Sequence, residues 1–83
     1  MVYNLEKDVI AIISDISGFD KEEITLETNL IKDLEVDSIK AIEIAVAIEK
    51  KYKVSVRDEE IPKFDSPKKI ITTIADLLKQ RAN

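Results

Sequence analysis

Apolar residues recur every three or four positions in three stretches of the chain. This spacing places them on one side of a helix, whereas a half-buried strand would alternate at every second position. The stretches predict a first helix from about Asn4 to about Ser17, a second from about Ser38 to Tyr52, and a final helix that begins at Pro67. Their apolar positions are Leu5, Val9, Ile12, Ile13 and Ile16 in the first, Ile39, Ile42, Ala45, Val46, Ile48 and Tyr52 in the second, and Ile70, Ile71, Ile74, Leu77 and Leu78 in the last.

Residues that commonly begin and end helices flank the first and last of these stretches. Asn4 and Ser66 can each accept a hydrogen bond from the first turn that follows them. Pro67 suits the first helical position, because the N–H that proline lacks would be unpaired there in any case. Gly18 is the only glycine, and a residue without Cβ can adopt the left-handed conformation that ends a helix.

The helical period is absent between the first two stretches. Apolar residues are spaced irregularly from Phe19 to Asp37, which predicts a long loop held across the bundle. Further on, Asp58 can cap a brief helical turn that Pro62 would limit. No segment has a long strand pattern. We therefore expect one all-α domain over residues 1–83, a four-helix bundle with three main helices, one short helix, and a long loop between helices one and two.

The composition is typical of a globular protein, with 45% hydrophobic and 36% charged residues. No apolar run has the length of a membrane span, and the start of the chain lacks a signal-peptide pattern. We expect a cytoplasmic monomer that does not insert into membranes. The net charge of −4 argues against nucleic-acid binding, which depends on clustered Lys and Arg, so the expected partners are proteins.

Cysteine and histidine are both absent. Their absence removes nucleophiles activated by a Ser–His or Cys–His pair, and it removes the common nitrogen and sulfur ligands of metals. We expect neither a metal site nor catalysis by the chain itself. A hydrolase that used Ser38 would have no histidine to activate it.

Ser38 follows Asp37 at the start of the second predicted helix. A helix start has unpaired N–H groups and the positive end of the macrodipole, so a phosphodiester attached there would be stabilised. The two residues alone are also explained as an ordinary helix cap, since Asp and Ser are common at such positions.

The segment Asp33-Leu34-Glu35-Val36-Asp37-Ser38-Ile39 resembles the prosthetic-group attachment site of acyl carrier proteins. The resemblance covers nearly the whole chain, because length, helix order and spacing agree as well. It includes the first helix, Gly18, Thr28, Leu30, Glu43, Glu49, the turn near Asp58 and the final helix.

This resemblance implies that Ser38 is the attachment residue for 4′-phosphopantetheine and that Asp37 is the acid before it. A phosphopantetheinyl transferase would transfer the group from coenzyme A, and the imported thiol would carry acyl intermediates as thioesters. The partners implied are acyl-transferring, condensing or acyl-activating enzymes of fatty-acid or related lipid biosynthesis. Two alternatives stay open: a polyketide, peptidyl or aminoacyl carrier, and a helical interaction module that is never modified.

The family likeness also implies a docking side on the second helix and room for an acyl chain beside it. The docking residues expected there are Ile39, Lys40, Ile42, Glu43, Val46 and Glu49. Small residues between large ones in this helix, Ala41, Ala45 and Ala47, either leave a gap for an acyl chain or let the helices pack closely.

Three positions depart from the family pattern. Ile39, Lys40 and Glu35 stand where relatives commonly have Leu, an acid and Gly. In the second helix and the residue after it, lysines outnumber acids: Lys40, Lys50, Lys51 and Lys53 against Glu43 and Glu49. This predicts a specialised carrier whose partners present a mixed or partly acidic face, although a solvated polar side explains the charges equally well.

Two further charge patterns do not predict binding sites of their own. The acids Asp33, Glu35 and Asp37 alternate as in a calcium-binding loop, but an EF-hand would need Gly in place of Ser38 and Glu in place of Ile44. The basic run 50–53 is too short for a nucleic-acid site and is explained by favourable charge at a helix end.

Overall fold

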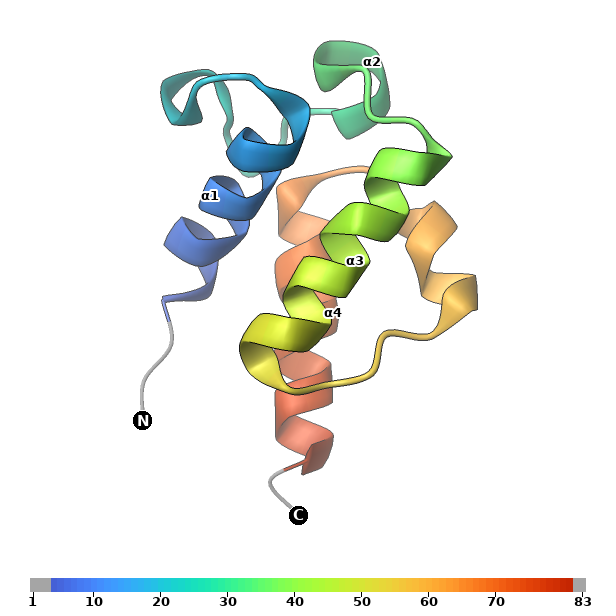
Figure 1. Cartoon of the computed structure of the whole chain (residues 1–83). Helices are drawn as coiled ribbons and strands as arrows, with labels where there is room; N and C mark the ends of the chain where they lie inside the picture. The colour runs from blue at the N-terminus through green and yellow to red at the C-terminus, as the bar shows by residue number, and fades with distance from the viewer. Residues whose placement is uncertain (1–3, 82–83) are drawn as a thin grey trace.

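A computed structural model describes residues 4–81, and every regular element in this range is helical. The order is α1 (Leu5–Ser17), the 3-10 helix η1 (Lys21–Glu23), α2 (Leu30–Leu34), α3 (Ser38–Tyr52), the 3-10 helix η2 (Asp58–Lys63) and α4 (Pro67–Arg81). Three main helices, α1, α3 and α4, form the bundle, and α2 lies across one end of it (Figure 1). The predicted all-α fold is confirmed.

The predicted boundaries of the main helices agree with the structure. Asn4 caps α1, its side chain accepting a hydrogen bond from the Lys7 N–H at 3.1 Å. Gly18 ends that helix with a φ of 84°, the left-handed conformation that glycine adopts without steric cost. At α4, Ser66 Oγ accepts from the Lys69 N–H at 3.2 Å, and Pro67 is the first helical residue.

The long connection between α1 and α3 contains two helical segments that the sequence pattern did not predict. Its second segment, α2, has only five residues, too few for a periodic pattern. The cap of α2 is its clearest signal: the Asn29 side chain accepts from the N–H groups of Ile31 at 3.0 Å and Lys32 at 2.8 Å. Two backbone bonds then fix the connection to the start of α4, from Leu30 N–H to Asp65 O and from Lys68 N–H to Leu26 O, both at 3.0 Å. The prediction of a loop held across the bundle is therefore confirmed.

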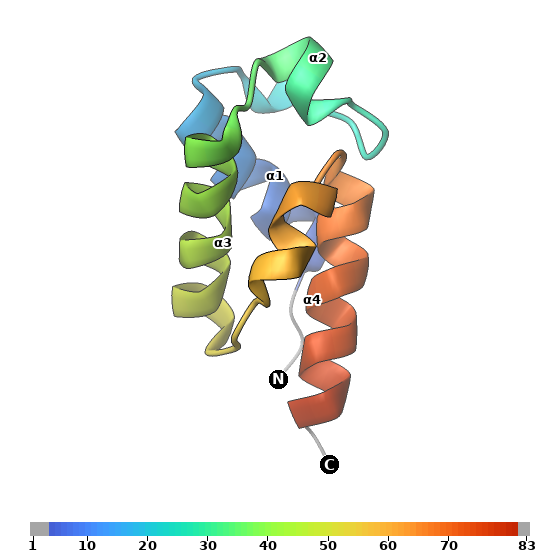
Figure 2. The same ribbon diagram turned by 90° about the vertical axis from the view of Figure 1, so that its right-hand side faces the viewer.

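The short helical turn before α4 also differs in detail from its prediction. Asp58 is the first residue of η2 and does not cap it, and Pro62 lies within the helix. A proline is accommodated because its fixed φ is also the φ of a 3-10 helix. Seen from the side, η2 lies between α3 and α4 (Figure 2).

The core is formed by apolar side chains from all the main helices and from the connections. Tyr52 is completely buried there, and its hydroxyl donates a hydrogen bond to Asp8 Oδ2 at 2.9 Å, which joins α3 to α1. No described helix is long and apolar enough to cross a membrane. The buried apolar residues are Val9, Ile13, Ile24, Leu30, Leu34, Val36, Ile44, Ala45, Ile48, Tyr52, Val56, Phe64, Ile70 and Ile74.

Candidate functional site

Ser38 lies at the solvent-exposed start of α3. Asp37 is the N-cap of this helix: its carboxylate accepts a hydrogen bond from the Lys40 N–H, and its carbonyl oxygen accepts one from the Ala41 N–H, both at 2.9 Å. The Ser38 hydroxyl makes no hydrogen bond to any residue from 4 to 81. Because it is exposed and unengaged, this oxygen is accessible to another protein.

Two backbone N–H groups beside this hydroxyl are also unengaged. The amides of Ser38 and Ile39 have no acceptor within the described chain. A helix N-terminus with free N–H groups favours an anion through hydrogen bonds and through the macrodipole. The first turn of α3 therefore suits a phosphodiester attached to Ser38.

A groove with a volume of about 760 Å³ begins at Ser38 and runs between α2, α3 and η2. Ala41 and Ile42 form its wall on α3, and Ile31 forms the wall on α2. Figure 2 shows these helices and η2 around one end of the bundle. The complete lining is Ile31, Val36, Asp37, Ser38, Ala41, Ile42, Asp58, Ile61, Pro62 and Phe64.

The three alanines of α3 differ in whether they border a gap or permit close packing. Ala41 lines the groove, so a gap does exist at this position. Ala45 is buried in the core, where its small size permits close packing. Ala47 lies beside α1 in a different hollow. Each of the two explanations therefore holds at a different position.

Comparison with known proteins shows which family the sequence matches. Residues 7–79 match the family model described as "Phosphopantetheine attachment site". An acyl carrier protein from Rickettsia bellii is 37% identical over 75 residues, which cover 90% of this chain and 87% of that protein. The chain belongs to the acyl carrier protein family. A meromycolate extension acyl carrier protein from Mycobacterium leprae is 34% identical over 76 residues, covering 87% of this chain and 66% of that protein.

The structure gives a reason for the glycine that acyl carrier proteins commonly have in place of Glu35. Glu35 ends α2 with a φ of 55°, a left-handed conformation in which its N–H bonds to Leu30 O. This conformation is unfavourable for residues with a Cβ and unstrained for glycine. Glu35 thus holds a backbone conformation that glycine would adopt without strain.

Four of the six predicted docking residues share the outer face of α3. Ile39, Ile42 and Val46 are 70%, 50% and 41% exposed, and Glu43 is exposed as well. Ile42 and Val46 border a hollow shared with α1, and Ile39 is the most exposed of the three. Their exposure leaves an apolar face available for contact with another protein.

The other two predicted docking residues, Lys40 and Glu49, flank that face on opposite sides. They are nine residues apart, so at 3.6 residues per turn they lie about 180° from each other around α3. Both are half-buried. Their participation in docking stays a prediction.

Glu49 has a structural contact that the sequence pattern did not indicate. Its carboxylate accepts a hydrogen bond from the backbone N–H of Val56 at 2.8 Å, across the turn that follows α3. This bond holds the connection to η2 against the helix.

We expect Glu49→Ala to lower the free energy of unfolding by about 1–2 kcal/mol, because it leaves the partly buried Val56 N–H without its charged acceptor. Glu43→Ala is the matched control on the same helix, since Glu43 is exposed and its carboxylate has no partner within the described chain. Its effect should be below about 0.5 kcal/mol. Urea unfolding followed by circular dichroism measures both, and equal losses would contradict a structural role for Glu49.

Ile31 is a surface residue of the groove that sequence reasoning missed as part of the site. It is 59% exposed on α2 and faces the groove from the side opposite Ala41 and Ile42. Its position in the groove depends on α2, which the apolar spacing of residues 19–37 does not predict. Asp33, Glu35 and Asp37 are exposed, and the described residues contain no group of three or more acidic side chains arranged to hold a metal ion.

Proposed function

We propose that Ser38 Oγ is the attachment point for 4′-phosphopantetheine, and that through it this chain carries acyl intermediates as thioesters. The chain is an acyl carrier protein of lipid biosynthesis, as its family membership implies. The observation that carries the choice of residue is the exposed, unengaged hydroxyl at the start of α3. A cytoplasmic monomer remains our expectation.

In this proposal the chain supplies the nucleophile and a phosphotransferase supplies the base. Ser38 Oγ forms a bond to the phosphorus that carries the pantetheine arm of coenzyme A, and the bond from that phosphorus to the remaining nucleotide breaks. The proton leaves the hydroxyl for a base on the transferase, because this chain has no histidine to receive it. Asp37 holds the first turn of α3 in place, and the amides of Ser38 and Ile39 can donate hydrogen bonds to the new phosphodiester. Once attached, the prosthetic group contributes a thiol that forms thioesters.

The groove beside Ser38 is proposed to shelter part of the acyl chain. Its lining is mainly apolar, and it begins at the residue from which the arm would extend. Each methylene withdrawn from water contributes about 0.8 kcal/mol. Even a partly inserted chain would therefore favour a sheltered state over one in which the chain is fully exposed.

We propose that partner enzymes dock on the exposed face formed by Ile39, Ile42, Glu43 and Val46. These partners would include the phosphopantetheinyl transferase and enzymes that transfer, condense or activate acyl groups. A carrier of polyketide or peptidyl intermediates is less favoured, because the similar proteins are named acyl carrier proteins. Lys40, beside Ser38, supports a specialised carrier.

An unmodified interaction module with the same fold is the competing function. To separate the two, the purified chain is incubated with a broad-specificity phosphopantetheinyl transferase and coenzyme A, and then with an acyl-activating enzyme and a fatty acid. We expect two successive mass increases, the second reversed by neutral hydroxylamine because it reports a thioester. An unchanged intact mass with several active transferases would support the interaction module instead.

A further inference from the structure

A second hollow lies on the other side of α3, between α3 and α1. It has a volume of about 400 Å³ and no part in the groove described above except for Ile42, which lines both. Its apolar surface comes from partly buried Ile12 and Ile16 on α1 and from exposed Ile42 and Val46 on α3. We call this surface the α1–α3 groove.

Charged residues are distributed unequally along the α1–α3 groove. The helices are antiparallel, so the end of α1 lies beside the start of α3 (Figure 1). Asp15 and Glu43 therefore lie toward the Ser38 end of the groove, and Lys50 lies toward the opposite end. All three are exposed, and none forms an ion pair within residues 4–81. The groove offers two free carboxylates, an apolar centre and one free ammonium group, in that order.

The distance to Ser38 indicates which kind of molecule would cover this groove. At a rise of 1.5 Å per residue, Glu43 lies about 7.5 Å and Lys50 about 18 Å from Ser38 along the helix axis. A protein interface that buries roughly 800 Å² on each partner is about 32 Å across if it is circular, which exceeds the distance from Ser38 to Lys50. An enzyme whose active site reaches Ser38 and whose surface follows α3 would therefore cover the whole groove.

We propose that the α1–α3 groove is a docking surface for an enzyme that acts at Ser38, and that the enzyme's matching surface has a fixed chemical order. A cationic side chain faces Asp15 and Glu43, an apolar side chain enters between α1 and α3, and a carboxylate faces Lys50. This deepens the proposed function and rests on it, since the enzyme is drawn to the groove by its work at Ser38. It adds α1 to the docking surface and explains why a partner face of mixed charge suits this chain.

Charge reversals at the two ends of the groove test this proposal. The probe is a broad-specificity phosphopantetheinyl transferase with coenzyme A, and the measured quantity is kcat/KM for conversion of the unmodified chain. We expect Asp15→Lys, Glu43→Lys and Lys50→Glu each to lower kcat/KM about tenfold, because each places like charges opposite each other. The losses should shrink as ionic strength rises, since salt screens exposed charges.

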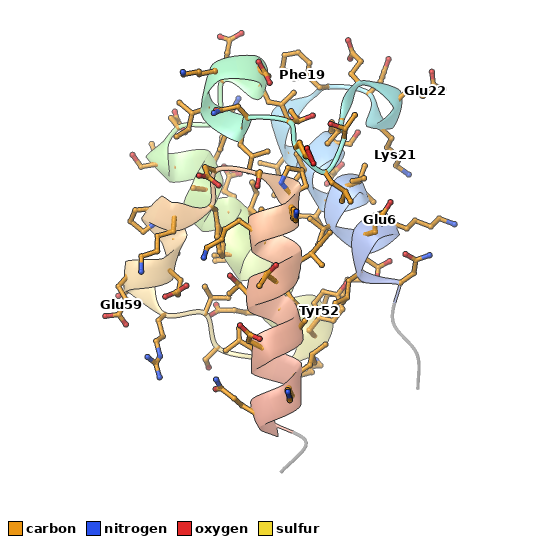
Figure 3. The ribbon with its side chains drawn as sticks, turned by 180° about the vertical axis from the view of Figure 1, so that it is seen from behind. Glu6, Phe19, Lys21, Glu22, Tyr52 and Glu59 are labelled. Carbon is orange, nitrogen blue, oxygen red and sulfur yellow. The ribbon has the colours of Figure 1, made fainter. Side chains whose placement is uncertain are left out.

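Matched controls carry the same change of net charge outside the groove. Glu6→Lys is on α1 at the outer edge of the bundle (Figure 3), and Lys79→Glu is on α4; both residues are exposed. These variants should stay within about twofold of the unaltered chain, and circular dichroism should show that all five are folded.

Three results would overturn the proposal. One is an unchanged kcat/KM for Asp15→Lys, which would remove α1 from the docking surface. Another is an equal loss in the control variants, which would leave only a net-charge effect. The third is a dimer in sedimentation that Lys50→Glu dissociates, since a second copy of the chain would then occupy the groove. Failure of the proposed function is recognised separately, because the unaltered chain would then gain no mass at all.

Discussion

Replacement of Ser38 by alanine is expected to abolish attachment of the prosthetic group while leaving the fold intact. The attachment reaction has no other nucleophile in the proposed site, so the loss should be complete. The Ser38 side chain is exposed and makes no hydrogen bond within the described residues. The free energy of unfolding should therefore change by less than about 0.5 kcal/mol. Intact mass after treatment with the transferase, together with urea unfolding, measures both quantities.

Ser66→Ala is the matched control for this experiment. Ser66 is also at a helix start, but its hydroxyl accepts a hydrogen bond from the Lys69 N–H. Its removal should cost about 1 kcal/mol of stability and leave the modification unaffected. The two variants therefore distinguish loss of covalent attachment from loss of a helix cap. Modification of Ser38→Ala at the normal rate would place the group on another residue and refute the assignment.

Filling the groove beside Ser38 is expected to remove most of the stability that an acyl chain adds to the protein. An acyl chain that buries four methylenes in the groove should raise the free energy of unfolding by about 3 kcal/mol relative to the form without a fatty acyl group. Ala41→Leu places a larger side chain on the groove wall, in the space that the acyl chain would use. We expect this variant to keep less than about 1 kcal/mol of that difference. Urea unfolding of the chain with and without a medium-length acyl group gives the values.

Ala47→Leu provides the comparison for Ala41→Leu. It makes the same change on the same helix, but Ala47 lines the α1–α3 groove. The acylated form of this variant should keep the full stabilisation. If the two variants behave alike, or if acylation does not stabilise the unaltered chain, the acyl chain is not held in the groove beside Ser38.

The main helices could be predicted because their signals are local. Asn4, Gly18 and Ser66 mark helix ends through their own backbone and side-chain chemistry, and the apolar spacing between them fixes which side is buried. The same local reasoning placed Asp37 and Ser38 at a helix start, where the structure has them. The five-residue helix α2 had only the Asn29 cap as a signal, and a cap without a periodic segment after it indicates a turn equally well.

The shape of the site depends on contacts that sequence spacing does not contain. Ile31 and Ala41 line the same groove, and backbone hydrogen bonds such as that from Leu30 to Asp65 help to hold the connection that carries Ile31. The Glu49 carboxylate accepts its hydrogen bond from the backbone N–H of Val56. Because nearly every residue has a backbone N–H, the residue type does not indicate this partner. Neither relation leaves a pattern in the residue types.

The arrangement of the charged residues of α3 was also not predictable from their order in the sequence. A count of lysines along the sequence does not show which of them share a surface. The helix places them on different sides. Lys50 lies in the α1–α3 groove, Lys51 lines a neighbouring hollow beside Asp8 and Asp15, and Lys40 is half-buried. A partner that docks as proposed would therefore meet a mixed surface with an acidic end and a basic end.

The most direct test is the mass of the protein isolated from its native host, with the modified residue located by fragmentation. We predict the mass of the chain plus one phosphopantetheine, free or acylated, with the phosphodiester on Ser38. An unmodified chain, in cells whose other carrier proteins are modified, would contradict the account, as would a prosthetic group located on any other residue.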